Sequence, residues 1–242
     1  MKSYSITDVG KRRSSNQDFC FCSERPLGDL PNLFIVADGM GGYAAGDLAS
    51  KLAVEAIVES ISTKHEKDIG KALQNAIKYA NTEIRKKAST DTMLEGMGTT
   101  CVCAVIEGKT LHIANVGDSR LYVKGEEISQ VTTDHSYVQE MVRMGRIKAS
   151  EASKHPNKNI ITRALGAEDG VEPDVFTYDL EEGDVIIMCT DGLTNMVNDK
   201  VIADVVGDGS DLELAGNTLI SFANENGGRD NITVALIAPF ER

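Results

Sequence analysis

The sequence contains no apolar run that approaches the ~20 residues of a transmembrane helix, so we expect no membrane span. Its first residues, MKSYSITDVGKRR, lack the apolar core of a secretory signal peptide, so export by that route is not expected. Internal repeats, low-complexity segments and linkers rich in proline or serine are also missing. These features favour a single domain over residues 1–242 in the cytoplasm.

Positive charge is scarce: 25 lysine and arginine residues face 37 aspartate and glutamate residues, which gives a net charge of −12. Such a protein does not attract nucleic acid or an anionic membrane by bulk charge, so we expect neither as a partner. An acidic protein still binds an anion where metal ions invert the local field.

Cysteine and histidine are also few, with five and four residues. Cys20/Cys22 and Cys101/Cys103 form Cys-x-Cys pairs, which on strands would place both thiols of a pair on one face. Zinc sites use Cys-x-x-Cys spacing with cysteine or histidine partners, and this pattern is missing. We interpret the cysteines as buried free thiols in a reducing compartment.

Apolar residues with helical spacing predict helices through residues 48–57, 69–84 and 212–223, the last ending near Asn226. A further short helix is expected near 137–144, followed by an exposed polar excursion that often carries access or specificity functions.

The section between the helices is rich in strands. TTCVCAVIEGKTLHIANVGDSRLYVKGEEISQVT has plausible hairpin turns at Glu107-Gly108 and Lys124-Gly125. DVIIMCTDG and DNITVALIA are nearly continuous apolar strands, which indicates that both faces are covered. Because strands follow strands and helices follow helices, we predict an α+β fold with antiparallel sheet packed under helices.

Four aspartates lie at the ends of these apolar strands: Asp38 in IVADGMGG, Asp118 in HIANVGDSR, Asp191 in IIMCTDG and Asp230 in RDNITV. Each alone is typical of a turn. Four carboxylates brought together repel one another and resist ionisation unless cations lie among them. Carboxylate, carbonyl and water oxygens suit Mg²⁺ or Mn²⁺, and Gly39, which has no Cβ, can bring its carbonyl close to an ion. Two such ions ~3.5–4 Å apart share a water and clamp a displacement at phosphorus.

A phosphate ligand also needs a positive anchor, and DVGKRRSSNQDF supplies Arg12 and Arg13. An arginine fork grips phosphate with two parallel hydrogen bonds. Local spacing does not choose between the two arginines. Taken alone, the segment equally fits a solvated basic patch before a strand.

These motifs, in this order, resemble the metal-dependent type 2C (PPM) protein serine/threonine phosphatases in their compact bacterial form. The resemblance covers essentially the whole chain and rests on TDVGKRRSSNQD, ADGMGGYAAGDLAS, GTT, VGDSRLY, TTDHS, HPNKNIITRALG, CTDGLTN and GGRDNITV. It implies a four-layer α-β-β-α sandwich of two antiparallel sheets flanked by helix pairs, with a variable flap at about 144–165 that tunes substrate choice.

The resemblance also implies roles for individual residues. Asp38 would bridge two metal ions, Gly39 would offer its carbonyl, Asp191 and Asp230 would complete the direct ligands, and Asp118 with Asp191 would hold a third, weaker ion. The family pattern Gly-x-x-Arg-x-x-Asn-x-Asp fits Gly10, Arg13, Asn16 and Asp18, and selects Arg13 for the phosphate. Asp18 would hold metal-bound water from outside the direct ligands.

Three positions depart from the common pattern. Gln17 replaces a frequent glutamate, which removes a negative charge from the surroundings of the second ion. Tyr43 replaces a histidine that is frequent in bacterial members and would alter how a substrate packs at the rim. Met40 takes the place of the histidine proposed as general acid in animal members. His135, His155 and a metal-bound water remain candidates for that role, and His135 equally fits a residue that only fixes a turn.

The implied reaction is hydrolysis of phosphoserine and phosphothreonine in proteins by a hydroxide that bridges the two ions. No phosphoenzyme is needed, and the Asp-x-Asp pattern of aspartyl-phosphate hydrolases is missing. We expect a monomer whose partners are phosphorylated proteins and a cognate serine/threonine kinase. The alternative is a catalytically weak or dead metal-binding regulatory domain of the same fold, and a purely structural cation-binding module explains neither Arg13 nor the flap.

Overall fold

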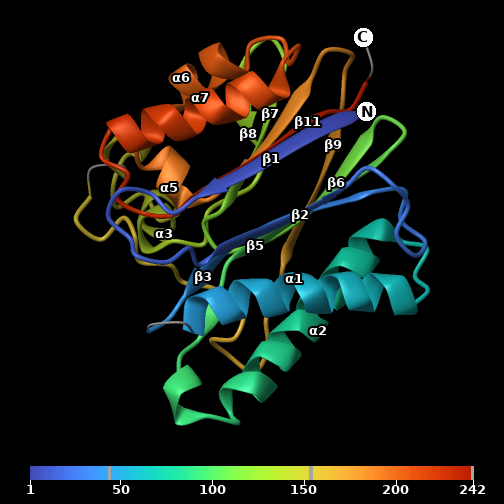
Figure 1. The fold of residues 1–242 in the computed structure, drawn as a ribbon, viewed down its shortest axis with the longest axis vertical. Helices are drawn as coiled ribbons and strands as arrows, with labels where there is room; N and C mark the ends of the chain where they lie inside the picture. Colours follow the sequence, from blue (N-terminus) through green and yellow to red (C-terminus); the bar gives the residue numbers. More distant parts are fainter. Residues whose placement is uncertain (43–44, 153–154, 241–242) are drawn as a thin grey trace.

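The computed structural model describes residues 1–42, 45–152 and 155–240. Two antiparallel sheets lie face to face, and helices cover the outer face of each sheet (Figure 1). The α+β sandwich predicted from the sequence is therefore confirmed. The start of β1 and the end of β11 lie side by side at one end of the sandwich, at the upper right of Figure 1.

The first sheet has the strand order β1-β11-β10-β7-β8 and is drawn in the upper half of Figure 1. Its strands are β1 (Lys2–Asp8), β7 (Arg120–Lys124), β8 (Ile128–Gln130), β10 (Val185–Cys189) and β11 (Ile232–Ala238). Apart from Thr233, β10 and β11 consist of apolar residues, and nearly all of their residues are buried because the strands lie inside a sheet covered on both faces.

The second sheet has the order β2-β3-β5-β6-β9, and the short β4 pairs with the end of β3. Its strands are β2 (Asp18–Ser23), β3 (Leu33–Met40), β4 (Gly98–Thr99), β5 (Cys101–Glu107), β6 (Thr110–Val116) and β9 (Asp174–Asp179). The turn at Gly108 joins β5 to β6, and Gly125 lies in the turn between β7 and β8, as the sequence predicts.

Helices α1 (Ala45–Thr63) and α2 (Ile69–Ala88) pack on the second sheet, whereas α6 (Asp199–Val206) and α7 (Leu212–Glu225) pack on the first. Asp68, Asn198 and Asp211 cap α2, α6 and α7 by accepting a hydrogen bond from a backbone N–H of the first turn. Three of these helices were predicted from apolar spacing; α6, which is only eight residues long, was not.

The hydrophobic core has three layers: one between the two sheets, one under α1 and α2, and one under α6 and α7. Alternate residues of one strand pack into different layers. Ile186 and Met188 of β10 point between the sheets, whereas Ile187 and Cys189 point under α6 and α7. The cysteines are free thiols: Cys101, Cys103 and Cys189 are buried, and Cys20 and Cys22 are half-buried.

The remaining helices are short. They are η1 (Thr92–Leu94), α3 (Tyr137–Arg143), α4 (Ala149–Ala152) and α5 (Asp191–Thr194). The helix α3 confirms the short helix expected near 137–144, and α4 lies within the segment predicted as a flap. None of the helices in the described part of the chain is long and apolar enough to cross a membrane.

Candidate metal centre

Four strand ends meet at one edge of the sandwich, and each carries one of the predicted aspartates. Asp38 lies near the end of β3, and Asp118 lies in the turn from β6 to β7. Asp191 lies two residues after the end of β10, at the start of α5, and Asp230 lies two residues before β11. Since β3 and β6 are both antiparallel to β5, they run in the same direction, and their C-terminal ends lie at the same end of the sheet. The end of β10 lies beside the start of β11 because these two strands are antiparallel.

The four aspartates line a single hollow of about 300 Å³ between the ends of the two sheets. Arg13, Gln17, Gly39 and Met40 line it as well, together with residues that were not predicted: Gly41, Thr100, Asn159 and Ile161. The structure therefore brings together residues that lie more than 200 positions apart in the chain, from Arg13 to Asp230. We call this cavity the metal hollow.

Burial and mutual repulsion act on the carboxyl groups of the metal hollow. Burial raises the pKa of Asp118 to about 7 and that of Asp191 to about 6, and neighbouring carboxylates add to each shift. The pKa of Asp38 is raised well above its usual range, first by burial and then by Asp18 and Asp191. Because a cation would relieve both effects, this cluster is an environment that favours metal binding.

Asp18 lies beneath the hollow at the start of β2 and is buried. Its Oδ2 accepts hydrogen bonds from the hydroxyls of Thr233 (2.7 Å) and Thr190 (2.9 Å). Its Oδ1 is also buried and has no hydrogen-bond partner among the described residues. A buried carboxylate oxygen without a partner is costly, and a water or hydrated ion would satisfy it. This geometry supports the position predicted for Asp18 behind the direct ligands.

Gly39 lies where only glycine fits. A Cβ at this position would stand 2.0 Å from the carbonyl oxygen of Gly46 and 2.6 Å from that of Gln17. The N–H of Gly39 donates to the same Gln17 carbonyl at 3.0 Å, and the hydroxyl of Ser50 donates to it at 2.6 Å. The close approach of α1 to β3 therefore requires glycine, and it holds the backbone of Gln17 beside the metal hollow.

Arg13 reaches the mouth of the hollow from the loop after β1. Its Nη2 donates a 2.8 Å hydrogen bond to Oδ2 of Asp230, and about half of its side chain is exposed. Arg12 is exposed and is not among the described residues that line the hollow. The geometry therefore agrees with the family pattern, which selects Arg13, and it places a guanidinium where an anion would enter.

The donor set fits a hard divalent cation. Mg²⁺ and Mn²⁺ prefer oxygen ligands. The hollow is lined by carboxylate oxygens and by the backbone of Gly39, and the unpartnered Oδ1 of Asp18 lies behind them. Across residues 1–42, 45–152 and 155–240, no three His, Cys, Asp or Glu side chains already have the spacing of a closed metal site.

Comparison with known proteins decides the family. The model of the family described as "Protein phosphatase 2C" matches residues 2–232. The chain belongs to this family. Protein phosphatase PhpP of Streptococcus pneumoniae (serotype 2, strain D39) is 40% identical over 240 residues, which cover 96% of this chain and 95% of that protein.

Solved structures agree with this assignment. The serine/threonine phosphatase Stp1 from Staphylococcus aureus superimposes with a TM-score of 0.90 at 35% identity, covering 99% of this chain and 95% of that one. The catalytic domain of the serine threonine protein phosphatase PstP, in complex with 2 manganese ions, superimposes with a TM-score of 0.83 at 31% identity, covering 97% and 96%. The chain is thus a protein serine/threonine phosphatase, and the comparisons give no support to an inert domain of the same fold.

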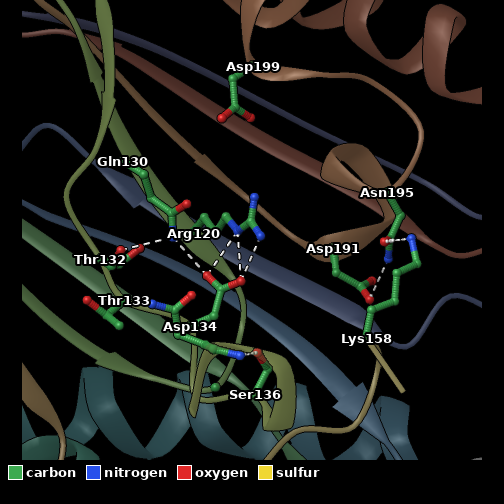
Figure 2. A network of polar contacts seen from close by, with 12 residues as sticks. Arg120, Gln130, Thr132, Thr133, Asp134, Ser136, Lys158, Asp191, Asn195 and Asp199 are labelled. Atoms are coloured by element: carbon green, nitrogen blue, oxygen red, sulfur yellow. Dashed lines mark hydrogen bonds and ion pairs between the residues drawn. The ribbon is translucent and has the colours of Figure 1, made fainter. Parts of the chain in front are cut away.

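A larger polar cavity of about 620 Å³ adjoins the metal hollow of this phosphatase and shares Asp118, Asn159 and Asp191 with it. Figure 2 shows the two networks that border it. In one, Arg120 donates to both carboxylate oxygens of Asp134 at 2.7–3.1 Å. This pair connects the first residue of β7 to the segment that leads into α3.

The second network of Figure 2 connects the flap to a predicted metal ligand. Lys158 donates from Nζ to Oδ1 of Asn195 at 2.6 Å, and Asn195 donates from Nδ2 to Oδ2 of Asp191 at 2.9 Å. Asn195 caps the C-terminal end of α5 one helical turn after Asp191, so both side chains lie on the same face. The predictions did not include Lys158 or Asn195, although both lie in the quoted motifs HPNKNIITRALG and CTDGLTN.

The two histidine candidates for the general acid lie outside the described lining of the metal hollow. His135 is buried; its Nδ1 accepts the N–H of Gly117 at 3.0 Å, and its Nε2 lies 3.2 Å from Oδ2 of Asp174. His155 contacts the ring of Tyr137 instead. The interpretation that His135 fixes a turn fits this geometry, because it holds the backbone just before Asp118.

Met40 and Tyr43 depart from the family pattern, and of these two residues the structure describes only Met40. Met40 lines the metal hollow, where its side chain packs beside Gly98. Tyr43 lies outside the described residues.

Proposed function

We propose that this phosphatase hydrolyses phosphoserine and phosphothreonine in proteins at the metal hollow, with two divalent ions, Mg²⁺ or Mn²⁺, held there. Asp38, Asp191, Asp230 and the carbonyl of Gly39 would hold the two ions. Asp118 and Asp191 would hold a third, weaker one. The observation that carries the proposal is that all four aspartates and Arg13 line one hollow.

Each residue's position in the hollow indicates its role. Arg13, at the mouth, binds the phosphoryl oxygens through its guanidinium and neutralises part of their charge. The aspartates below it hold the cations, and Asp18 accepts a hydrogen bond from a water through its unpartnered Oδ1. Bound divalent ions supply Lewis acidity and lower the pKa of a shared water. The net charge of −12 is no obstacle, because cations and Arg13 dominate the local field.

A manganese complex of the PstP catalytic domain supports the choice of metal. We also propose that the segment 144–165 acts as a flap over a single catalytic domain, and its side chains Asn159 and Ile161 border the hollow. A cytoplasmic monomer that opposes a serine/threonine kinase is the setting that this proposal implies.

Hydrolysis of p-nitrophenyl phosphate and of a phosphothreonine peptide tests the proposal. With Mn²⁺ we expect activity on both substrates, which EDTA abolishes and added Mn²⁺ restores. Asp191→Asn should lower the activity by more than about 100-fold, because it removes a charged ligand. Asp199→Asn is the matched control, since this exposed carboxylate accepts a bond from the hydroxyl of Tyr122 outside the hollow. Activity that survives both EDTA and Asp191→Asn would remove metal-dependent chemistry from this site.

A further inference from the structure

A small cavity of about 190 Å³ opens beside the metal hollow and shares Met40 and Ile161 with it. We call it the rim pocket. Its lining is mainly apolar and includes Met40, Ile161, Ala164, Ala167 and Val171. Nothing in the chemistry at the phosphate needs an apolar cavity at this place.

The charged residues of the rim pocket are already engaged or exposed. Arg163 donates from Nη1 to Oδ1 of Asp174 at 2.7 Å and to the carbonyl of Glu172 at 2.8 Å, so its guanidinium is held at the edge of β9. Glu168 is exposed to solvent. Apart from the carboxylate of Glu168 at the solvent edge, a ligand that enters the pocket therefore meets mainly apolar surface.

The flap-side wall of the pocket is fixed by backbone hydrogen bonds. On either side of Ile161, the carbonyl of Ile160 accepts from the N–H of Tyr137 at 2.8 Å and the N–H of Thr162 donates to the carbonyl of His135 at 2.8 Å. Ile161 is thus anchored to the segment at the start of α3.

The opposite wall is anchored to the core. Leu165 exchanges two backbone hydrogen bonds with Thr99, of 2.9 and 3.0 Å, and the N–H of Gly166 donates to Oδ1 of Asn81 in α2 at 2.7 Å. Asn81 is almost completely buried. A pocket whose walls are anchored in this way needs little ordering when a ligand binds, which favours selective binding.

We propose that the rim pocket is a specificity subsite, which takes one aliphatic side chain of the phosphoprotein substrate from a residue close to the phosphorylated one. This inference rests on the proposed function. Met40 follows Asp38 by two residues on β3, a spacing of about 7 Å, which two residues of an extended substrate also span. Met40 suits such a wall because a flexible thioether adapts to branched side chains.

Hydrolysis of matched phosphothreonine peptides tests this inference. The peptides carry leucine or serine at each of the two positions on either side of the phosphothreonine. For the unaltered protein we expect one position at which leucine gives about 10-fold higher kcat/KM than serine, as expected for burial of an aliphatic side chain. p-Nitrophenyl phosphate has no neighbouring residue and serves as the reference substrate.

Ala167→Phe should fill the rim pocket from its exposed edge and remove the leucine preference, while hydrolysis of p-nitrophenyl phosphate stays unchanged. Ala167→Asp should remove it as well and favour lysine at the same position. Ala149→Phe, a change at an exposed alanine beside the larger cavity, should retain the leucine preference.

If leucine has no advantage at any position, or if its advantage survives both Ala167 variants, the subsite is wrong although the proposed function stands. If the unaltered protein with Mn²⁺ cleaves neither p-nitrophenyl phosphate nor any peptide, the proposed function falls and the subsite falls with it.

Discussion

The hydroxyls of Thr100 and Ser119 share a buried hydrogen bond of 2.7 Å. Oγ1 of Thr100 also accepts the backbone N–H of Asp38 at 3.0 Å, and the N–H of Thr100 donates to the carbonyl of Asp38 at 2.9 Å. Ser119 directly follows Asp118. Thr100 therefore joins the strand end that carries Asp38 to the turn that carries Asp118, so it sets the spacing between two predicted metal ligands.

Thr100→Val retains the shape of the side chain and removes the hydroxyl. We expect about 10-fold weaker Mn²⁺ binding, because groups that orient metal ligands typically contribute 10- to 100-fold to affinity. The variant should also lose about 1–3 kcal/mol of stability, since the N–H of Asp38 and the hydroxyl of Ser119 lose a buried partner. Titration of activity with Mn²⁺ measures the first effect and urea unfolding the second.

The control for this variant is Thr218→Val, at an exposed hydroxyl of α7 that donates to the carbonyl of Leu214. Its Mn²⁺ dependence should match that of the unaltered protein. A Thr100→Val protein that is less stable but binds Mn²⁺ normally would show that the hydroxyl bond serves folding and not the metal centre.

Arg13→Ala should raise KM for p-nitrophenyl phosphate and weaken inhibition by inorganic phosphate by about 10-fold or more. A hydrogen bond to a charged group contributes about 1.5–3 kcal/mol, and 1.4 kcal/mol corresponds to a factor of ten. Arg12→Ala is the matched control, because its side chain lies next in the chain but is not among the described residues lining the hollow. The opposite result, an effect of Arg12→Ala without one of Arg13→Ala, would shift the phosphate anchor by one residue.

Because the pKa of Asp18 is raised in the folded protein, we expect the folding stability of the metal-free protein to depend on pH. Burial raises the pKa of Asp18 to about 7, compared with about 3.9 in an unfolded chain. Below about pH 4 the group is protonated in both states and contributes nothing. Between the two pKa values, Asp18 is ionised in the unfolded chain but still protonated in the folded protein. The free energy of unfolding therefore falls as the pH rises through this range, and it levels off above about pH 7. Each unit of difference corresponds to about 1.4 kcal/mol.

Urea unfolding in EDTA from pH 5 to pH 8 measures this dependence. Asp18→Asn should flatten the decline because an amide does not titrate, and its oxygen can still accept from Thr190 and Thr233. A residual slope from Asp118 and Asp191 is expected. Asp204→Asn, at an exposed position of α6, should leave the slope unchanged. If Asp18→Asn also leaves it unchanged, the buried carboxyl at Asp18 is not the group that titrates.

Several structural elements followed from local patterns. The spacing of Leu73, Ile77 and Ile84 predicted α2, and the continuous apolar run ending at Cys189 predicted a strand covered on both faces. Local patterns were weaker for β9, where exposed and half-buried residues alternate at the sheet edge, and for the short α6. A short or half-exposed element carries too few apolar residues for its period to be recognised.

Residue identity and chain order predicted antiparallel sheet packed under helices and aspartates at strand ends, because amphipathic spacing and motif chemistry are local properties of a chain. The resemblance of the ordered motifs to a known family implied the two-sheet sandwich. Only the packed molecule showed the size and further lining of the metal hollow, the bond from Thr100 to Ser119, the chain of contacts from Lys158 to Asp191 and the rim pocket. These features join segments from different strands and loops, and their distances depend on how two sheets and a flap pack together. No spacing within a single segment records that packing.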